Sequence, residues 1–297
     1  MRSPAYLVLA LGVIAVSSAA VLIREAEAPA LVIAAYRLGL AAMPAGAAAV
    51  VLAPRYPFQA RSLRWPLLAG AFLALHFGFW IASLQQTSVI TSVVLVTTNP
   101  LFVGLASPFL LKERVAKATW AGIAVSIAGA GVMAVEDVGE GWGTLTGDLY
   151  ALLGAVFSAA YLMTGRRARR EMAWTGYIGA AYTAAALLLV ASVIVAGESF
   201  TGYSAKTFLM FGLLALVPQL IGHSAINWSL AYVPAALVAV AILGEPVGAT
   251  ALAAFVLGET PTALELLGSA FVLAGVYVAL RPARRPSEAV PLEQAAT

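Results

Sequence analysis

The chain has 297 residues, of which 62% are hydrophobic and only 10% are charged, and its mean hydropathy is +0.92. Soluble domains carry roughly a quarter of charged residues, so this chain has too few charges to cover a water-facing surface. The composition excludes an ordinary soluble protein and predicts an integral membrane protein. The net charge of +3 gives no reason to expect a nucleic-acid partner, and without cysteine there is no disulfide or thiol chemistry.

Ten long apolar stretches fill almost the whole chain. A transmembrane helix needs about 20 apolar residues, and these stretches have that length between charges, prolines and glycine clusters. They are continuously apolar and do not alternate with polar residues, which favours helices over a β-barrel. The sequence therefore predicts an all-α integral membrane protein with ten transmembrane helices, at residues 5–23, 30–52, 67–87, 89–111, 118–135, 149–165, 175–196, 208–230, 234–257 and 264–280.

Basic residues gather on one side of this predicted topology. The N-terminus, the connections after the second, fourth and sixth helices, and the C-terminal tail together hold 14 of the 17 lysines and arginines. The opposite side holds only Arg24 and Lys206, and Arg37 lies within the second helix. Because cytoplasmic loops of membrane proteins are enriched in Lys and Arg, we expect a multi-pass protein of a bacterial inner membrane with both termini in the cytoplasm.

The N-terminal stretch also has features of a cleaved signal peptide. Arg2 precedes an apolar run, and Ala26-Glu27-Ala28 follows it in the manner of a cleavage site. The run of about 19 residues is too long for a typical signal peptide, and cleavage would leave nine helices. We therefore interpret it as the first transmembrane helix. At the other end, residues 282–297 are polar and proline-rich, which predicts a disordered cytoplasmic tail.

The second half of the chain repeats the first at a constant offset of 146 residues. Each copy holds five predicted helices, and because five is an odd number, the second copy must enter the membrane upside down. We therefore predict two inverted repeats, residues 1–141 and 142–281. Such repeats are typical of secondary transporters, which expose a central site to alternate sides of the membrane. The matching pairs include Asn99-Pro100 with Glu245-Pro246, Gly122 with Gly268, and Gly129 with Gly275.

Several of these motifs resemble the EamA branch of the drug/metabolite transporter superfamily. The segment from Asn99-Pro100 to Lys112-Glu113-Arg114 is similar to the fourth helix of that family and its following turn, and Glu245-Pro246 begins what looks like the second copy. Ala35-Tyr36-Arg37-Leu38 resembles the arginine-containing part of the second helix. The resemblance covers about residues 5–280 and implies a ten-helix carrier. Within the branch the chain is most similar to an inner-membrane amino-acid exporter that favours aromatic amino acids.

Polar side chains inside the membrane are costly, so they are candidates for function. The third and eighth helices, which are repeat equivalents, each carry a polar stripe at helical spacing, and both stripes should face the axis between the repeats. A central binding cavity is the functional interpretation, and hydrogen bonds that only join helices are the alternative. The candidate substrate-binding residues are His76, Phe79, Trp80, Ser83, Asn99, Phe157, Tyr161, Gln219, His223, Asn227 and Glu245.

Glu245 lies near the middle of the ninth helix, immediately before Pro246. A carboxylate at this depth must be paired, protonated or hydrated; substrate contact, proton coupling and structural pairing are equal alternatives for it. Arg37 lies about two turns from the outer end of its helix, near enough for its side chain to extend toward the interface. We assign structural roles to the charges of Arg37, Glu113 and Glu259, and hinge roles to Pro100 and Pro246.

These observations predict a carrier that exports amino acids, with aromatic and other apolar ones preferred, or similar small metabolites. Efflux of cationic drugs by proton antiport is the alternative, although small multidrug members of the superfamily use a glutamate in the first helix, where this chain has only Ser17 and Ser18. An integral-membrane enzyme is a remote alternative, because the sequence has no metal cluster, nucleotide loop or nucleophile–base motif. We expect no cofactor, a small-molecule substrate, a lipid bilayer as surroundings, and a monomer in preference to an obligate oligomer.

The charge asymmetry makes the topology testable. Activity reporters fused to either terminus should report the cytoplasm, and a reporter inserted in the loop between residues 136 and 148 should report the periplasm. A periplasmic C-terminus would contradict the inverted five-plus-five arrangement.

Overall fold

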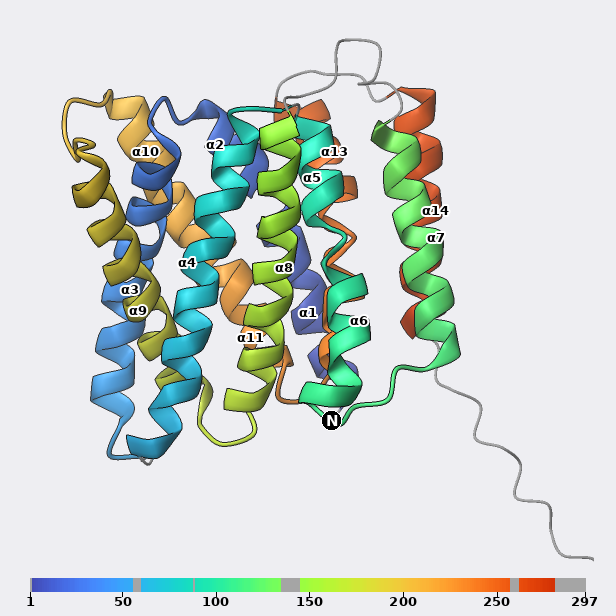
Figure 1. Ribbon diagram of the computed structural model, residues 1–297, viewed down its shortest axis with the longest axis horizontal. Helices are drawn as coiled ribbons and strands as arrows, with labels where there is room; N and C mark the ends of the chain where they lie inside the picture. The colour runs from blue at the N-terminus through green and yellow to red at the C-terminus, as the bar shows by residue number, and fades with distance from the viewer. Residues whose placement is uncertain (1, 56–59, 88, 135–144, 257–261, 281–297) are drawn as a thin grey trace, which may run out of the picture.

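The computed structural model describes residues 2–55, 60–87, 89–134, 145–256 and 262–280, and nearly all of them are helical. The helices stand side by side in one bundle (Figure 1). Seven helical segments are long and apolar enough to cross a membrane, and shorter apolar helices accompany them. The predicted all-α membrane fold is confirmed, and the arrangement agrees with ten membrane crossings.

The helices follow the predicted transmembrane segments, although several segments are divided. The first half holds α1 (Arg2–Val16), α2 (Ala19–Glu25), α3 (Ala30–Leu52), the short 3-10 helix η1 (Ala60–Leu63), α4 (Arg64–Leu84), α5 (Val89–Val96), α6 (Asn99–Leu110) and α7 (Lys117–Ala134). The second half holds α8 (Leu145–Ala168), α9 (Trp174–Ala196), α10 (Ala205–Leu214), η3 (Ala215–His223), α11 (Ser224–Ser229), α12 (Ala235–Ile242), α13 (Glu245–Val256) and α14 (Ala263–Leu280).

Two of the divided segments are interrupted at repeat-equivalent positions. α5 ends at Val96 and α6 begins at Asn99, while α12 ends at Ile242 and α13 begins at Glu245, which is the same offset of 146 residues. Proline has no N–H to donate to the carbonyl four residues earlier, so Pro100 and Pro246 cannot satisfy the carbonyls of Val96 and Ile242. The chain tightens there into short turns, with Thr98 N donating to Leu95 O at 3.1 Å and Gly244 N to Ala241 O at 3.0 Å.

The interruption between α1 and α2 has a different cause. The hydroxyl of Ser17 donates to the carbonyl of Val13 at 2.9 Å, and that of Ser18 donates to the carbonyl of Ala15 at 2.8 Å. Serine side chains compete in this way with the helical hydrogen bonds of the backbone. The sequence analysis expected one continuous helix over residues 5–23, so this break was not predicted.

The eighth predicted helix contains a π-helical segment, η3, between α10 and α11. Pro218 lies inside it and removes one backbone donor. π-Helical turns are rare and occur mostly at functional positions. The segment carries Gln219 and His223, and it packs closely against α1, where a Cβ added at Gly222 would lie 3.1 Å from the backbone nitrogen of Val16.

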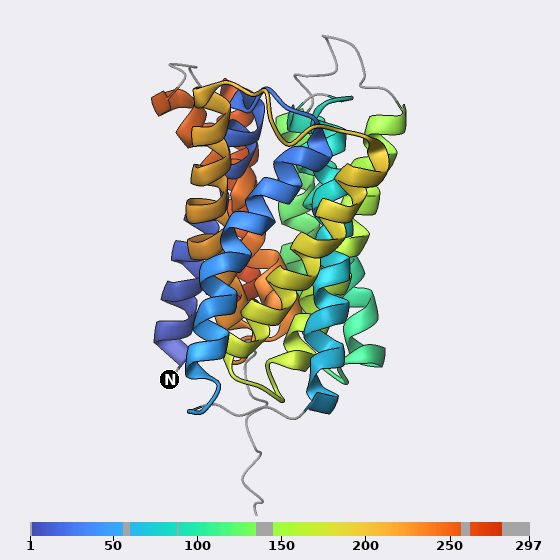
Figure 2. The same ribbon diagram turned by 90° about the vertical axis from the view of Figure 1, so that its left-hand side faces the viewer.

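α4 and α8 pack against each other in the middle of the bundle, with α3 and α9 on one flank and α7 and α14 on the other (Figure 1). α3 and α9 lie side by side in front, both tilted, when the bundle is viewed from that flank (Figure 2). We call the face at which α1 begins the N-terminal face. The hydroxyl of Ser229 donates to the carbonyl of Ala5 at 3.3 Å, which joins the end of α11 to the start of α1 at this face.

α7 and α14 pack closely through glycines that are repeat equivalents. A Cβ added at Gly122 would lie 2.5 Å from the carbonyl oxygen of Gly275, and one added at Gly129 would lie 2.6 Å from that of Gly268. The two contacts exchange their partners under the 146-residue offset, as an inverted repeat requires. Small residues let helix backbones approach in a membrane, where packing drives association.

Alanine at Gly129 should separate these two helices. Overpacking of this kind costs roughly 1–3 kcal/mol, so Gly129→Ala should lower the midpoint of thermal unfolding in detergent, measured by size-exclusion chromatography. Gly131→Ala in the same helix is the matched control, because nothing lies within 4 Å of a Cβ placed there. Equal midpoints for the two variants would contradict the close packing.

Candidate substrate site

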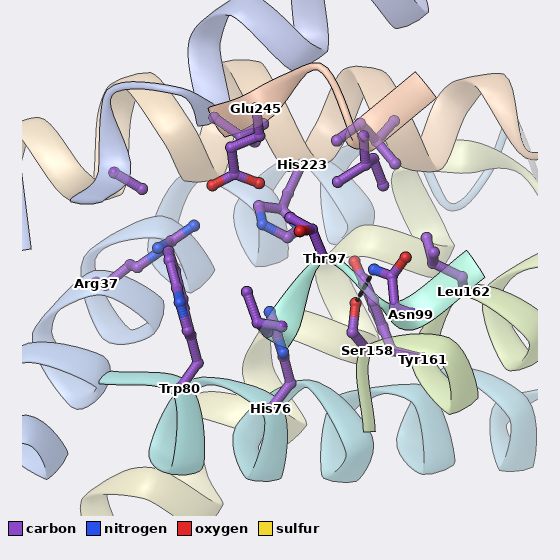
Figure 3. A pocket seen from close by; sticks show the side chains of 15 residues that line it. Arg37, His76, Trp80, Thr97, Asn99, Ser158, Tyr161, Leu162, His223 and Glu245 are labelled. Atoms are coloured by element: carbon purple, nitrogen blue, oxygen red, sulfur yellow. Dashed lines mark hydrogen bonds between the residues drawn. The ribbon is translucent and has the colours of Figure 1, made fainter. Parts of the chain in front are cut away.

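A cavity lies between the two halves of the bundle, at the level where α5 and α12 end. Its apolar walls are Val16, Ala19, Val96, Leu162, Ile226 and Ile242, and its polar walls are Arg37, His76, Trp80, Thr97, Asn99, Ser158, Tyr161, His223 and Glu245 (Figure 3). The volume of this cavity is only about 30 Å³. The cavity is therefore narrow and would have to widen around an organic substrate.

Arg37 contributes a fully buried guanidinium to this cavity. Its Nε donates to Gln219 Oε1 at 3.0 Å, and its Cζ lies 3.9 Å from the centroid of the Phe77 ring. Nη1 and Nη2 are buried and have no hydrogen-bond partner among the described residues. From the sequence, this side chain was near enough to the membrane interface to reach it and was assigned a structural charge; in the structure it is fully enclosed. The backbone of α3 at residue 37 lies inside the bundle, and the side chain points into the cavity (Figure 3).

Glu245 is the acidic residue of the cavity wall. It is the first residue of α13 and is partly buried, and its carboxylate points into the same space as the Arg37 guanidinium (Figure 3). The ion pairs closer than 4.0 Å in the described part of the chain include neither Glu245 nor Arg37. The two opposite charges therefore face one cavity without direct contact.

His76 and Trp80 form one wall from successive turns of α4. Their rings are stacked, with centroids 5.9 Å apart and an interplanar angle of 5°. His76 Nδ1 donates to the carbonyl of Gly154 at 2.9 Å, so the neutral ring presents Nε2 as an acceptor. Trp80 Nε1 is a buried donor without a partner, and His223 Nδ1 is likewise unpartnered among the described residues.

Asn99 and Tyr161 complete the polar wall. Asn99 Nδ2 donates to the hydroxyl of Ser158 at 3.0 Å, and its Oδ1 is buried without a partner. The hydroxyl of Tyr161 accepts from Asn227 Nδ2 at 2.5 Å, and Asn227 also donates to Tyr182 at 3.3 Å. Buried polar groups are costly to leave unpaired, so the free atoms that line this cavity are suited to hydrogen-bond a ligand.

A cluster of charges closes the N-terminal face below the cavity. Arg166 Nε donates to Glu113 Oε1 at 2.7 Å, and Arg170 Nη2 donates to the same oxygen at 2.5 Å. Arg166 also donates to the carbonyl of Leu230 at 2.5 Å, and the backbone nitrogen of Ala235 donates to Glu113 Oε2 at 3.4 Å. Glu113 thereby joins the end of α6 to the end of α8 and the start of α12.

A second cavity of about 140 Å³ lies on the side of the central cavity that faces away from this charge cluster. It is lined by Ala20, Ile23, Arg24, Ala26, Leu84 and Gln85. Ala20 follows Ala19, and Leu84 lies one helical turn beyond Trp80, so the two cavities occupy successive levels between α2 and α4.

Comparison with known families covers nearly the whole chain. The EamA-like transporter family matches residues 3–135 and again residues 145–281, one match for each half. The chain belongs to this family.

Curated relatives of this EamA-like transporter are more distant and partial. An uncharacterized transporter, YdfC, of Bacillus subtilis is 24% identical over 69% of the chain and 67% of its own length. A riboflavin transporter of Rhizobium johnstonii is 32% identical over 62% of the chain and 55% of its own length. A solved structure described only as the crystal structure of a protein has a TM-score of 0.77 at 22% identity, covering 96% of this chain and 100% of that one. This last likeness supports the fold alone.

The structure brings together only part of the predicted binding set of this EamA-like transporter. His76, Trp80, Asn99, Tyr161, His223 and Glu245 line the cavity. Gln219 and Asn227 do not line the cavity. They hydrogen-bond to two residues that do, Arg37 and Tyr161 respectively. Ser83 lies outside the cavity and hydrogen-bonds to Ser92 at 2.5 Å.

Two aromatic candidates lie on the wrong face of their helices. Phe79 stacks on Phe157 with ring centroids 5.7 Å apart, and Phe157 also stacks on Phe72 at 6.3 Å. Neither Phe79 nor Phe157 lines the cavity. They pack α4 against α8, because Phe79 points about 100° away from its neighbour Trp80 around the helix. Their expected contact with substrate is therefore not supported.

Several wall residues were not predicted, and Arg37 is the most important of them. The signal available in the sequence was the cost of an arginine inside an apolar helix, which usually marks a functional position. Thr97 and Ser158 were also missed, since single hydroxyls in apolar helices carry little sequence signal. Glu113 was assigned a structural charge and makes the ion pairs described above, whereas Glu259 lies outside the described residues.

The interrupted helices of this EamA-like transporter lead to a prediction about motion. Pro100→Ala supplies an N–H that can donate to Val96 O and straighten the break, as Pro246→Ala does in the second repeat. One backbone hydrogen bond is worth about 0.5–1.5 kcal/mol, so each variant should slow exchange transport about two- to tenfold and change substrate affinity less. Rates and affinities would be measured in proteoliposomes.

Pro108→Ala is the matched control for this prediction. Pro108 lies inside the same helix, α6, on an exposed face and without an interruption beside it. Its replacement should leave the exchange rate unchanged. Unchanged turnover in both hinge variants would limit Pro100 and Pro246 to packing.

Proposed function

We propose that this protein exports amino acids, preferentially aromatic and other apolar ones, or similarly small metabolites, across a bacterial inner membrane by alternating access. The observation that carries the proposal is the cavity between the repeats. It combines apolar walls with buried polar atoms of both kinds that have no partner among the described residues, namely the donors of Arg37 and Trp80 and the acceptor Asn99 Oδ1. Small polar molecules with an apolar part match this combination.

The symmetry of the bundle supports alternating access. The breaks before Asn99 and Glu245 are repeat equivalents, and each lies beside the cavity. Interrupted helices at the interface between inverted repeats are a recurrent feature of secondary transporters, which rock one part against another around a fixed site. The proposed orientation places the N-terminal face, with the cluster around Glu113, in the cytoplasm, so the described conformation is closed on that side.

Two other substrates have specific support and are weaker. Riboflavin is suggested by the relative that is 32% identical, but it carries no ionised group at neutral pH to occupy the positions facing Arg37 and Glu245. Cationic drugs would have a partner in Glu245, but Arg37 in the same wall repels them.

Transport by the purified protein tests the proposal directly. Proteoliposomes would be offered labelled phenylalanine, tryptophan, alanine, riboflavin and a lipophilic cation, with and without an imposed pH gradient. Uptake of the amino acids above that of protein-free liposomes supports the proposal, and the effect of the gradient reports whether protons are coupled. Uptake of riboflavin alone would replace the proposal of amino-acid export by riboflavin transport. Uptake of the cation alone would replace it by efflux of cationic drugs.

Trp80 should set the preference for aromatic substrates. Its ring lines the cavity beside His76, and an aromatic contact contributes about 0.5–1.5 kcal/mol beyond area burial. Trp80→Ala should therefore reduce transport of phenylalanine and tryptophan about two- to tenfold more than that of alanine or threonine. Phe79→Ala, on the outer side of the same helix, is the control and should reduce all substrates alike. An equal loss for every substrate in Trp80→Ala would remove Trp80 from the site.

A further inference from the structure

We propose that the cavity recognises both charges of a zwitterionic headgroup, with Arg37 binding the carboxylate and Glu245 binding the ammonium. The inference rests on the proposed function and makes it specific, because it requires a substrate that carries both groups. It assigns substrate contact to Arg37, for which the sequence indicated a structural role.

The first step is the geometry of Arg37. A guanidinium presents its N–H donors as a rigid planar fork that matches the two oxygens of a carboxylate. Here the Nε position is already occupied by Gln219, while Nη1 and Nη2 are buried and unpartnered within the described residues. The ring of Phe77, 3.9 Å from Cζ, supports one face of the guanidinium. Gln219 and Phe77 thus hold the side chain, and Nη1 and Nη2 are directed into the cavity (Figure 3).

The second step is the position of Glu245. Its carboxylate faces the same space from α13, in the second repeat, whereas Arg37 belongs to α3, in the first. No ion pair within 4.0 Å joins the two side chains. An uncompensated charge in a low-dielectric interior is strongly unfavourable. A direct pair would satisfy both groups, whereas their separation leaves each of them free to pair with one charge of a ligand once the cavity widens.

The third step is the chemistry between the two charges. Asn99 Oδ1 can accept from an ammonium, and Trp80 Nε1 can donate to a carboxylate oxygen. Val16, Ala19 and Ile226 offer apolar surface for a side chain. The charged headgroup of the substrate is thereby oriented between the two repeats. The side chain of the substrate meets a wall that tolerates different apolar shapes. This explains how one site would accept several amino acids and reject molecules that lack either charge.

The test uses competition against labelled phenylalanine in proteoliposomes of the full-length protein. The competitors are phenylalanine, phenylalaninamide, which lacks the carboxylate, and 3-phenylpropionate, which lacks the ammonium. With the wild-type protein, each incomplete analogue should compete at least about tenfold more weakly than phenylalanine, because it lacks one of the two hydrogen-bonded charge contacts. Arg37→Gln should abolish the preference for phenylalanine over phenylalaninamide. Glu245→Gln should abolish the preference for phenylalanine over 3-phenylpropionate.

The crossed pattern separates recognition from folding. Arg61→Gln, at an exposed arginine that lines neither cavity, is the control and should keep both preferences. If Arg37→Gln fails to fold, the competition experiment with Glu245→Gln alone tests the inference. Loss of folding weakens all competitors equally, so it cannot change one preference selectively. Equal weakening for all three competitors in a folded Glu245→Gln variant would overturn the inference. If the wild-type protein neither transports nor binds any amino acid, the proposed function itself fails.

Discussion

The buried charge of Arg37 is the constraint on which the arrangement of the central helices depends. A guanidinium at this position has no route to water, so its surroundings must hold it and balance it. Gln219 from η3 accepts its Nε hydrogen, Phe77 from α4 covers one face, and Glu245 from α13 faces it across the cavity. The four elements that meet here come from both repeats. The single charge of Arg37 in α3 therefore determines where the two halves of the bundle place their polar surfaces.

The same interior is built to change shape. Pro100 and Pro246 deprive the carbonyls of Val96 and Ile242 of their helical donors. Val96 and Ile242 both line the cavity. In a bilayer, irregular backbone is tolerated only where it is buried in protein or beside a water-filled space. The breaks satisfy this condition, because they lie inside the bundle beside the cavity. The two faces are unequal in the described conformation, since Glu113 joins three helix ends on one side while an additional cavity lies toward the other.

The regions away from the cavity have a different role. α7 and α14 hold each other through glycine contacts that are exchanged by the repeat, and Phe79 and Phe157 join α4 to α8 outside the site. These contacts preserve the shared fold, which persists in a solved structure at only 22% identity. We propose that substrate choice depends on a few wall residues, because one fold can carry different functions. A relative named for riboflavin transport is therefore compatible with a different substrate here.

The sequence alone determined the membrane environment, the helical class, the two repeats and six of the cavity-lining residues. Composition and repeat spacing are sufficient for these features, because an apolar helix must lie in lipid and a polar side chain within it must turn inward. The sequence could not decide which inward neighbour each side chain meets. Phe79 and Trp80 are adjacent in α4, yet only Trp80 lines the cavity. Arg37 was assigned a structural charge, because its position along one helix does not show which groups of other helices surround it. Only the tertiary structure, with η3 and α4 packed around that position, shows that the charge is enclosed.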